Sequence, residues 1–146
     1  MTGTGGATGI EVRARDVHVA YDGHEVLRGV DLHVRPGRIV AVTGPSGAGK
    51  TTLLWSLAGL VRPGGGEVVV DGVVPRDRDQ TSAAGVVLIP QDNALAGVLT
   101  ASENVLVPLL AARVPPGEAQ ARAHAALESV GLGAAGSQLI EELSGG

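Results

Sequence analysis

One glycine-rich segment constrains this chain more than any other feature. Residues 44–51 read GPSGAGKT and match the pattern G-x-x-x-x-G-K-[ST] in full. Small residues let the backbone wrap around a phosphate, so that consecutive N–H groups point inward. We expect Lys50 to reach the outer phosphates of a nucleotide and the Thr51 hydroxyl to ligate Mg²⁺. The predicted nucleotide-binding residues of this phosphate loop are Gly44, Pro45, Ser46, Gly47, Ala48, Gly49, Lys50, Thr51 and Thr52.

Chance does not explain the match, even in a glycine-rich chain. The 146 residues include 23 glycines, one lysine and 15 serines plus threonines. With these frequencies a random chain would contain the pattern in about 0.2% of cases. The one lysine is Lys50, whereas the other ten basic residues are arginines. This choice indicates a need for a compact ammonium group rather than a planar guanidinium.

The residues around the loop predict strands on both sides of it. Apolar and polar residues alternate over residues 10–21, with a slip near Asp16, and again over residues 30–34. We therefore expect an antiparallel sheet at the start of the chain, with turns at residues 22–23 and, after a strand at 67–70, at residues 71–72. The short apolar runs 38–43 and 86–89 are typical of strands buried on both faces of a parallel sheet.

Helices are predicted directly after the loop and in the last third of the chain. The first spans about residues 49–58 and is stopped by Gly59 and Pro63. Thr100 and Glu103 form a capping-box pattern at the start of another helix. After residues 115–117 a further helix presents one apolar face, and Gly131 stops it. The residues of that face are Ala119, Ala123, Ala126, Leu127 and Val130.

Charge and composition exclude several kinds of partner. The net charge of −4 and a pI near 5.5 argue against a nucleic-acid-binding surface. There is no cysteine for disulfides or thiolate metal sites, and the four histidines lack metal-ligand spacing. The longest apolar run, residues 105–112, is far shorter than the roughly 20 residues of a membrane span. We expect a cytoplasmic protein with a disordered lead-in at residues 1–9, which do not read as a signal peptide.

Two further motifs narrow the choice among kinases, GTPases and other ATPases that share such a loop. Gln91 ends the predicted strand at 86–89, and the chain closes on Leu143-Ser144-Gly145-Gly146. In this order, the three motifs resemble those of the ATP-binding-cassette (ABC) ATPases over residues 10–146. The resemblance implies that Gln91 contacts Mg²⁺ and the attacking water. It also implies that Ser144, Gly145 and Gly146 contact ATP held by a second ATP-binding subunit.

The resemblance also gives roles to Tyr21 and to the residues that follow Gln91. An aromatic residue near the position of Tyr21 stacks on adenine in the family; the alternative is a tyrosine packed on the sheet. The resemblance implies that the region from Gln91 to Glu103 binds a transmembrane permease. Leu95, Val98 and Leu99 would be either contact residues for the permease or core residues. Taken alone, Gln91 reads as an ordinary strand-end residue, and residues 144–146 as a flexible terminus.

The resemblance implies an α/β fold with a P-loop NTPase (RecA-like) core. We expect an ABC ATP-binding domain from residue 10 to 146. Residues 10–92 would form an N-terminal antiparallel β subdomain with the loop-bearing core, and residues 93–146 a partial helical subdomain. The expected function is binding of ATP and Mg²⁺ as a transporter subunit, peripheral at the inner face of the membrane. The segment ENVLVPLLAARV is similar to exporters of lipoproteins, peptides or macrolides. The alternatives are a soluble ABC ATPase without a membrane partner and a fragment without catalysis.

The catalytic carboxylate of the family has no counterpart in this sequence. The family places Asp and Glu at the end of a strand after the signature, and the only similar segment, VVVDG at residues 68–72, lies before Gln91 and reads as a turn. The C-terminal part of the core is thus expected to be missing, as in a truncated form of a longer protein. We expect the 146 residues alone to fold partially or aggregate, and to show no ATP turnover.

Overall fold

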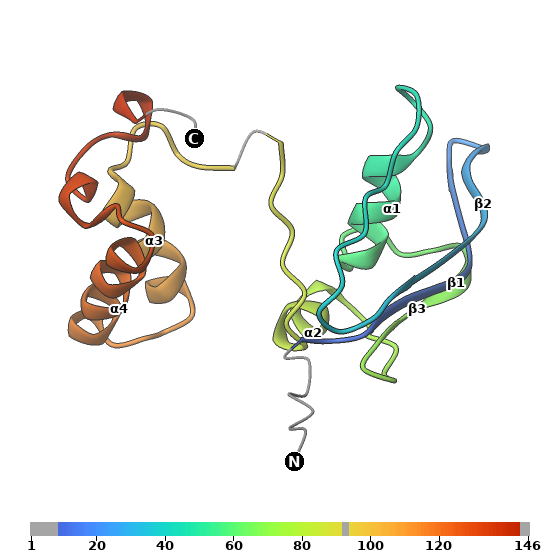
Figure 1. Ribbon diagram of the computed structural model, residues 1–146, viewed down its shortest axis with the longest axis horizontal. Helices are drawn as coiled ribbons and strands as arrows, with labels where there is room; N and C mark the ends of the chain where they lie inside the picture. Colours follow the sequence, from blue (N-terminus) through green and yellow to red (C-terminus); the bar gives the residue numbers. More distant parts are fainter. Residues whose placement is uncertain (1–8, 92–93, 144–146) are drawn as a thin grey trace, which may run out of the picture. The chain divides into compact units, whose positions relative to one another are not determined.

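The computed structural model describes residues 9–91 and 94–143, which belong to two units (Figure 1). Unit 1 runs to Leu88 and unit 2 begins at Ile89. The predicted lead-in lies outside the described residues except for Gly9, and so do Ser144, Gly145 and Gly146. The domain division that we predict after residue 92 stays a prediction.

Unit 1 is built on an antiparallel sheet of strands β1 (Val12–Tyr21), β2 (His24–Val34) and β3 (Gly65–Val70), in the order β2-β1-β3. The turn between β1 and β2 has positive φ angles at Asp22 (48°) and Gly23 (78°). Both angles fit a type I′ turn, whose twist matches that of the strands. The predicted antiparallel opening of the chain is confirmed, as is the turn at residues 71–72, where Val70 and Val73 pair.

A β-bulge at Asp16 interrupts β1 at the predicted slip. The pairing with β2 shifts between Ala14 and Val17, and Asp16 has a φ of 48°. Its backbone N–H donates to Asp31 Oδ1 on β2 at 3.0 Å. Gly66 on β3 lies so close that a Cβ there would overlap the carbonyl oxygens of Arg15 and Asp16. The bulge therefore requires a glycine on the neighbouring strand.

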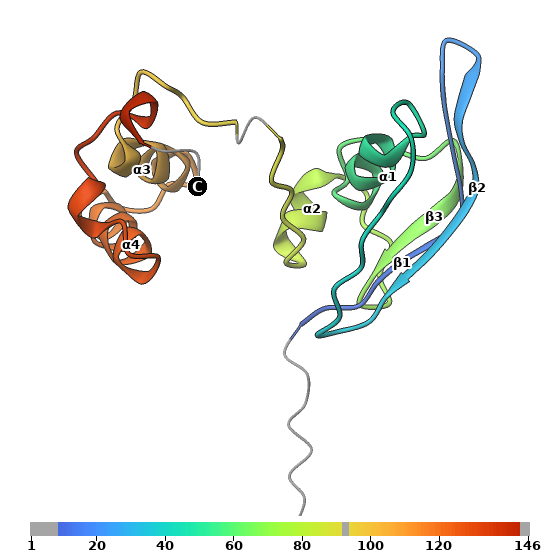
Figure 2. The same ribbon diagram turned by 45° about the horizontal axis from the view of Figure 1, so that its top comes forward.

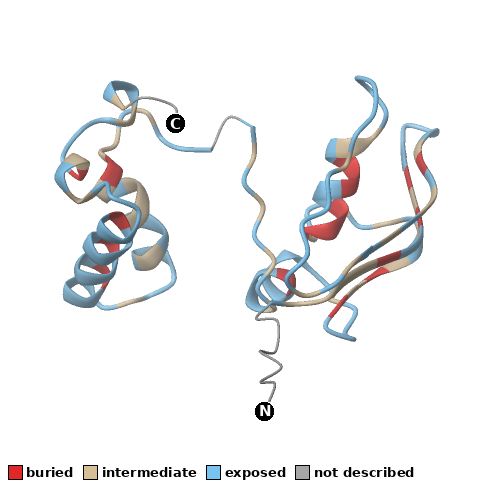
Figure 3. Cartoon of the chain, in the orientation of Figure 1, coloured by how far each residue is buried: buried red, intermediate tan, exposed pale blue. Residues whose placement is uncertain are grey.

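Helix α1 (Lys50–Leu57) covers one face of this sheet and forms the core of unit 1 with it (Figure 3). The core contains only aliphatic side chains, and the chain has no phenylalanine. Its buried members are Ala14, Val17, Val19, Leu27, Leu53, Leu57, Val68 and Val70. This packing fixes the start of α1, and with it the phosphate loop, against the sheet.

The two apolar segments predicted as buried strands are not strands. Residues 38–43 and 86–90 have no regular structure, and among the described residues neither pairs with a strand. Ile39 is fully exposed, and Val87 and Ile89 are each 78% exposed. A strand exists only when neighbours satisfy its backbone N–H and C=O groups. The prediction of buried strands is therefore wrong for the described chain, which supplies no such neighbours.

A short helix in unit 1, α2 (Arg78–Ala83), was not predicted from the sequence. The Asp77 carboxylate caps its start by accepting from the Gln80 N–H at 2.9 Å. The signal was available, because an acidic residue followed three positions later by glutamine is a helix-start pattern.

Unit 2 contains α3 (Ala101–Ala111), α4 (Pro116–Ser129) and the short 3-10 helices η1 (Gly133–Ala135) and η2 (Ile140–Glu142). The predicted capping box of Thr100 and Glu103 is confirmed. Hydrogen bonds from the Thr100 backbone N–H and hydroxyl lower the pKa of Glu103. In α4, Ala119, Ala123 and Leu127 are buried as predicted, whereas Ala126 and Val130 are exposed.

The four α-helices of the described residues end in the same way. In each, the N–H two residues beyond the helix cap bonds to a carbonyl five residues earlier, as in Leu132 to Leu127 (2.8 Å) and Val114 to Leu109 (3.0 Å). The residue before that N–H has a positive φ, and in three helices it is glycine: Gly59, Gly85 and Gly131. In α3 it is Arg113, with a φ of 62°.

Arg113→Gly should therefore stabilise unit 2. A left-handed conformation costs a residue with a Cβ about 1–2 kcal/mol, and the greater freedom of glycine in the unfolded chain returns about 0.4–1 kcal/mol of that. We expect a net gain of about 0.5–1 kcal/mol in the free energy of unfolding, measured by urea unfolding and by slower exchange of the Val114 amide. The control Ala121→Gly, in mid-α4, should lose about 1 kcal/mol. Faster Val114 exchange in Arg113→Gly would contradict the account.

Candidate functional site

The phosphate loop lies between the irregular segment 38–43 and the first residue of α1. Its glycines adopt conformations that favour glycine: φ is 153° at Gly44, 79° at Gly47 and 85° at Gly49. A turn closes within the loop, where the Ala48 N–H donates to the Pro45 carbonyl at 3.3 Å. The loop thus leads directly into a helix N-terminus, where free N–H groups and the helix dipole favour an anion.

Gly49 fixes the loop against the sheet. A Cβ at this position would lie 3.0 Å from Leu27 Cδ2 and 3.1 Å from both the Cγ1 and the carbonyl oxygen of Val26. Leu27 is itself only 3% exposed. The end of the phosphate loop is therefore in close contact with the backbone of β2, and a larger residue than glycine would push the two apart.

Lys50 lies across the loop that precedes it. Its Nζ donates to the Gly44 carbonyl at 3.0 Å and to the Pro45 carbonyl at 2.6 Å. These two bonds hold the ammonium group against the backbone at the start of the loop. The structure thus brings the positive charge and the predicted phosphate-binding backbone together.

The two threonines after Lys50 face different environments. Thr51 is exposed, so its hydroxyl is available to a ligand. Thr52 is only 8% exposed, and its carbonyl accepts from Ser56 Oγ at 2.9 Å. The role of Thr52 in nucleotide binding stays a prediction.

The turn between β1 and β2 lies at the same end of unit 1 as the segment before α1 that contains the phosphate loop (Figures 1 and 2), and Tyr21 directly precedes this turn. It is the last residue of β1, pairs with His24 and is 43% exposed. Because Tyr21 is this exposed, part of its ring surface is free to contact a base. The arrangement fits the predicted stacking role of Tyr21, which stays a prediction.

Gln91 belongs to unit 2, and its backbone has no regular structure. Its side chain is exposed. Of the predicted signature, only Leu143 is among the described residues, where its N–H bonds to the Ile140 carbonyl at 3.1 Å. The predicted roles of Gln91 and of residues 144–146 are not tested by this structure.

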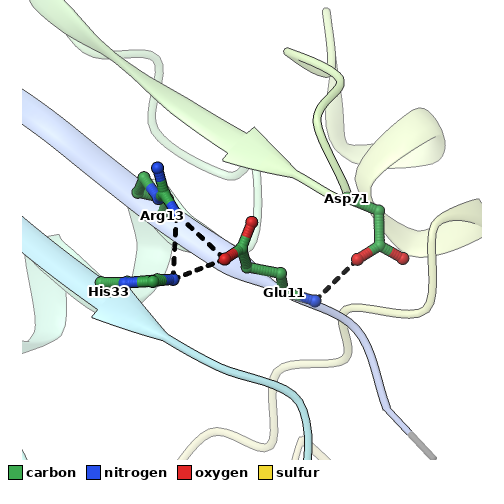
Figure 4. Close-up of polar contacts among 4 residues, drawn as sticks. All are labelled: Glu11, Arg13, His33 and Asp71. Atoms are coloured by element: carbon green, nitrogen blue, oxygen red, sulfur yellow. Dashed lines mark hydrogen bonds and ion pairs between the residues drawn. The ribbon is translucent and has the colours of Figure 1, made fainter.

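A cluster of charged residues joins the strand ends of the sheet, and sequence reasoning missed it (Figure 4). The Glu11 carboxylate contacts His33 Nε2 and accepts from the Arg13 guanidinium at 3.0 Å, while its backbone N–H donates to Asp71 Oδ1 at 2.7 Å. The hydrogen bond from His33, with that from Arg13, lowers the pKa of Glu11. Because these groups pair with one another, we assign the cluster a structural role.

A second polar cluster surrounds His18 on the same hairpin. Its imidazole lies between Glu25 Oε1 at 2.9 Å and Asp16 Oδ1 at 3.0 Å. Hydrogen bonds that the His18 ring donates to the Glu25 carboxylate and, second, to the Asp16 carboxylate raise the pKa of His18. Across the part of the chain that the structure describes, no group of three or more His, Asp or Glu side chains is arranged to hold a metal ion.

Comparison with known proteins identifies the family. The family model for ABC transporters matches residues 27–146. The chain belongs to the ABC transporter family. None of the described helices is long and apolar enough to cross a membrane.

Curated members of the ABC family resemble the chain along most of its length. It is 42% identical over 143 residues to the methionine import ATP-binding protein MetN of Thermobifida fusca, covering 92% of this chain and 44% of MetN. It is 41% identical over 126 residues to the lipoprotein-releasing system ATP-binding protein LolD 1 of Rhodopirellula baltica, covering 83% of this chain and 55% of LolD 1. The chain therefore spans about half the length of these relatives.

Solved ABC structures share the fold. The ATP-binding cassette MJ0796, in a dimeric post-hydrolysis state bound to ADP and Pi, matches with a TM-score of 0.73 and 28% identity, over 91% of this chain and 63% of that one. CbiO1 of Clostridium perfringens, part of the transporter complex CbiONQ, also gives a TM-score of 0.73, at 23% identity over 91% of this chain and 55% of that one. The predicted P-loop NTPase fold with an antiparallel β subdomain is confirmed, in partial form.

Proposed function

We propose that this chain is the ATP- and Mg²⁺-binding part of an ABC transporter ATPase subunit. The observation that carries the proposal is the phosphate loop, whose glycine conformations and single lysine converge at the start of α1. The named relatives are ATP-binding proteins of transport systems, which favours a transporter subunit over a soluble ABC ATPase. Within the complete subunit, the reaction would be hydrolysis of ATP, with water as the nucleophile.

Each predicted site residue has a distinct part in binding. The loop backbone and the Lys50 ammonium would bind the phosphates, and the exposed Thr51 hydroxyl is a suitable oxygen ligand for Mg²⁺. Bound Mg²⁺ would neutralise charge on the β- and γ-phosphates. Gln91 would orient the water and contact the metal, and Ser144, Gly145 and Gly146 would contact ATP on a second subunit. Catalysis in this scheme comes from positioning and from charge neutralisation.

The membrane partner is proposed to bind unit 2 in the region from Gln91 to Glu103. Two of the three apolar side chains singled out there, Leu95 and Val98, are exposed, and Leu99 is half-buried. Exposed apolar patches mark protein-binding surfaces, and the exposure of Leu95 and Val98 supports placing the partner here. Through this contact the subunit would lie at the inner face of the membrane. The proposal that the transporter is an exporter is supported by the similarity of residues 103–114 to exporters and by the LolD relatives.

Replacing Tyr21 tests the proposed base contact. Tyr21→Ala should weaken ATP and GTP to a similar extent, because stacking needs only the face of a ring and is worth about 1–3 kcal/mol per base. Tyr21→Phe keeps the ring and should bind ATP as the unaltered chain does. Titration of both nucleotides, followed through the fluorescence of Trp55 on α1, measures the effect. If Tyr21→Phe lost as much affinity as Tyr21→Ala, the hydroxyl and not the ring would be the contact.

A further inference from the structure

A short loop before α3 holds exposed apolar side chains on a fixed backbone. We call residues 95–100 the docking loop. Leu95 is 48% exposed and Val98 is 81% exposed. The far end of the loop is bonded to the start of η2, because the Ile140 N–H donates to the Leu99 carbonyl at 3.3 Å and Thr100 pairs with Leu139. The Val98 side chain buries little surface, so its packing contributes little to the stability of the fold.

The side chain of Asn104, in the first turn of α3, holds the rest of the docking loop. Its Oδ1 accepts from the Ala96 N–H at 2.9 Å, and its Nδ2 donates to the Ala96 carbonyl at 3.1 Å. The same Nδ2 lies within 3.3 Å of the Leu99 carbonyl and 3.0 Å of the Thr100 carbonyl. Two N–H groups thus serve three carbonyl oxygens, so at least one N–H is shared.

These contacts make a carboxamide the only common side chain that fits. One atom must accept from the Ala96 N–H while its neighbour donates to the Ala96 carbonyl, and only asparagine and glutamine carry both functions on one planar group. Asparagine is a poor residue inside a helix, so helix propensity does not account for it here.

We propose that Asn104 is the positioning residue that holds the docking loop in the conformation which presents Leu95 and Val98 to the membrane partner. The inference rests on the proposed function, which places the partner at this segment. The side-chain hydrogen bonds of Asn104 all lie within unit 2, and the role proposed for it is in coupling between subunits and not in ATP binding.

The first test measures loop order in the chain itself. The sequence has no cysteine, so Val98→Cys gives a single site for a nitroxide spin label. Asn104→Asp keeps the acceptor for Ala96 but replaces both N–H donors by an oxygen facing three carbonyl groups. We expect the label at residue 98 to become clearly more mobile in Asn104→Asp, while a label at Val107→Cys on α3 keeps its spectrum. Unchanged mobility at residue 98 would overturn the proposal.

A second variant guards against simple unfolding of α3. Asn104→Ser retains a hydroxyl that can bond to the Thr100 carbonyl within the helix, but it is too short to reach Ala96. We expect the helical circular dichroism to be retained and the label at residue 98 to become mobile, as in Asn104→Asp. If the label at residue 98 were no more mobile in Asn104→Ser than with the unaltered Asn104, a positioning role would be contradicted.

The decisive test uses the complete transporter, purified as ATP-binding subunit and membrane partner, with MgATP as the nucleotide. Asn104→Asp should weaken binding of the partner by about tenfold or more and leave the dissociation constant of ATP unchanged. Val98→Glu, which alters the surface and not the loop backbone, should weaken the partner similarly. If only Val98→Glu weakens it, Asn104 does not position the loop. If Val98→Glu has no effect, the proposed docking site itself is wrong, whatever Asn104 does.

Discussion

In any form of the protein that is long enough to fold, Lys50→Ala should weaken ATP binding by about tenfold or more and leave the fold intact. The Lys50 ammonium lies over the phosphate loop and donates to the carbonyls of Gly44 and Pro45. Hydrogen bonds to a charged group contribute about 1.5–3 kcal/mol, and 1.4 kcal/mol corresponds to a tenfold change in affinity. Alanine is a good residue for the start of a helix, so α1 should persist.

The measurement is a titration with ATP in the presence of Mg²⁺, followed by Trp55 fluorescence, together with a thermal melt. Lys50→Arg is the matched control, since it keeps the charge but presents a planar fork in place of a compact ammonium. We expect it to bind ATP more weakly than the unaltered chain. An unchanged dissociation constant for ATP in Lys50→Ala would remove the nucleotide site from this loop.

Gly66→Ala should destabilise unit 1 more than a methyl group added at any other position in it. Gly66 has a φ of 72°, and a Cβ there would overlap the backbone carbonyl oxygens of Arg15 and Asp16. The left-handed conformation alone costs alanine about 1–2 kcal/mol. Because backbone atoms at the bulge cannot rotate away as a side chain can, we expect a total loss of about 4 kcal/mol or more in the free energy of unfolding.

Gly72→Ala separates the two causes of that loss. Gly72 has a φ of 79°, similar to that of Gly66, but a Cβ there would meet no atom within 4 Å. It should lose only the conformational cost of about 1–2 kcal/mol. Urea unfolding of both variants, followed by circular dichroism, gives the comparison. Equal losses in Gly66→Ala and Gly72→Ala would show that β1 and β3 are not in close contact at the bulge.

Local features of this chain could be predicted because their causes lie within a few residues. Asp22 and Gly23 form the expected turn since both tolerate the positive φ that the turn requires. Thr100 and Glu103 form the expected cap since the partners are three residues apart. The phosphate loop follows the same logic, because glycine conformations and the adjoining helix define it together.

Features that depend on distant neighbours could not be predicted in the same way. The apolar run at residues 38–43 is typical of a strand, but a strand also needs neighbouring strands to pair with its backbone N–H and C=O groups. The described residues supply no such neighbour. Asn104 gave no recognisable signal, since its partners are set by the path of the docking loop and not by spacing alone. Gly66 was likewise hidden, because its neighbour Asp16 is 50 residues earlier in the sequence.

The contact between Gly49 and β2 has a consequence for the kind of ligand that unit 1 can accommodate. The strand begins at His24, which pairs with Tyr21, and reaches Gly49 at Val26 and Leu27. Three residues of extended chain, from His24 to Leu27, span roughly 10 Å. If a base stacks on Tyr21 as proposed, its separation from phosphates at the loop would be set by the rise of one strand. The backbone geometry would then limit the length of the ligand, independently of the contacts that individual side chains make with it.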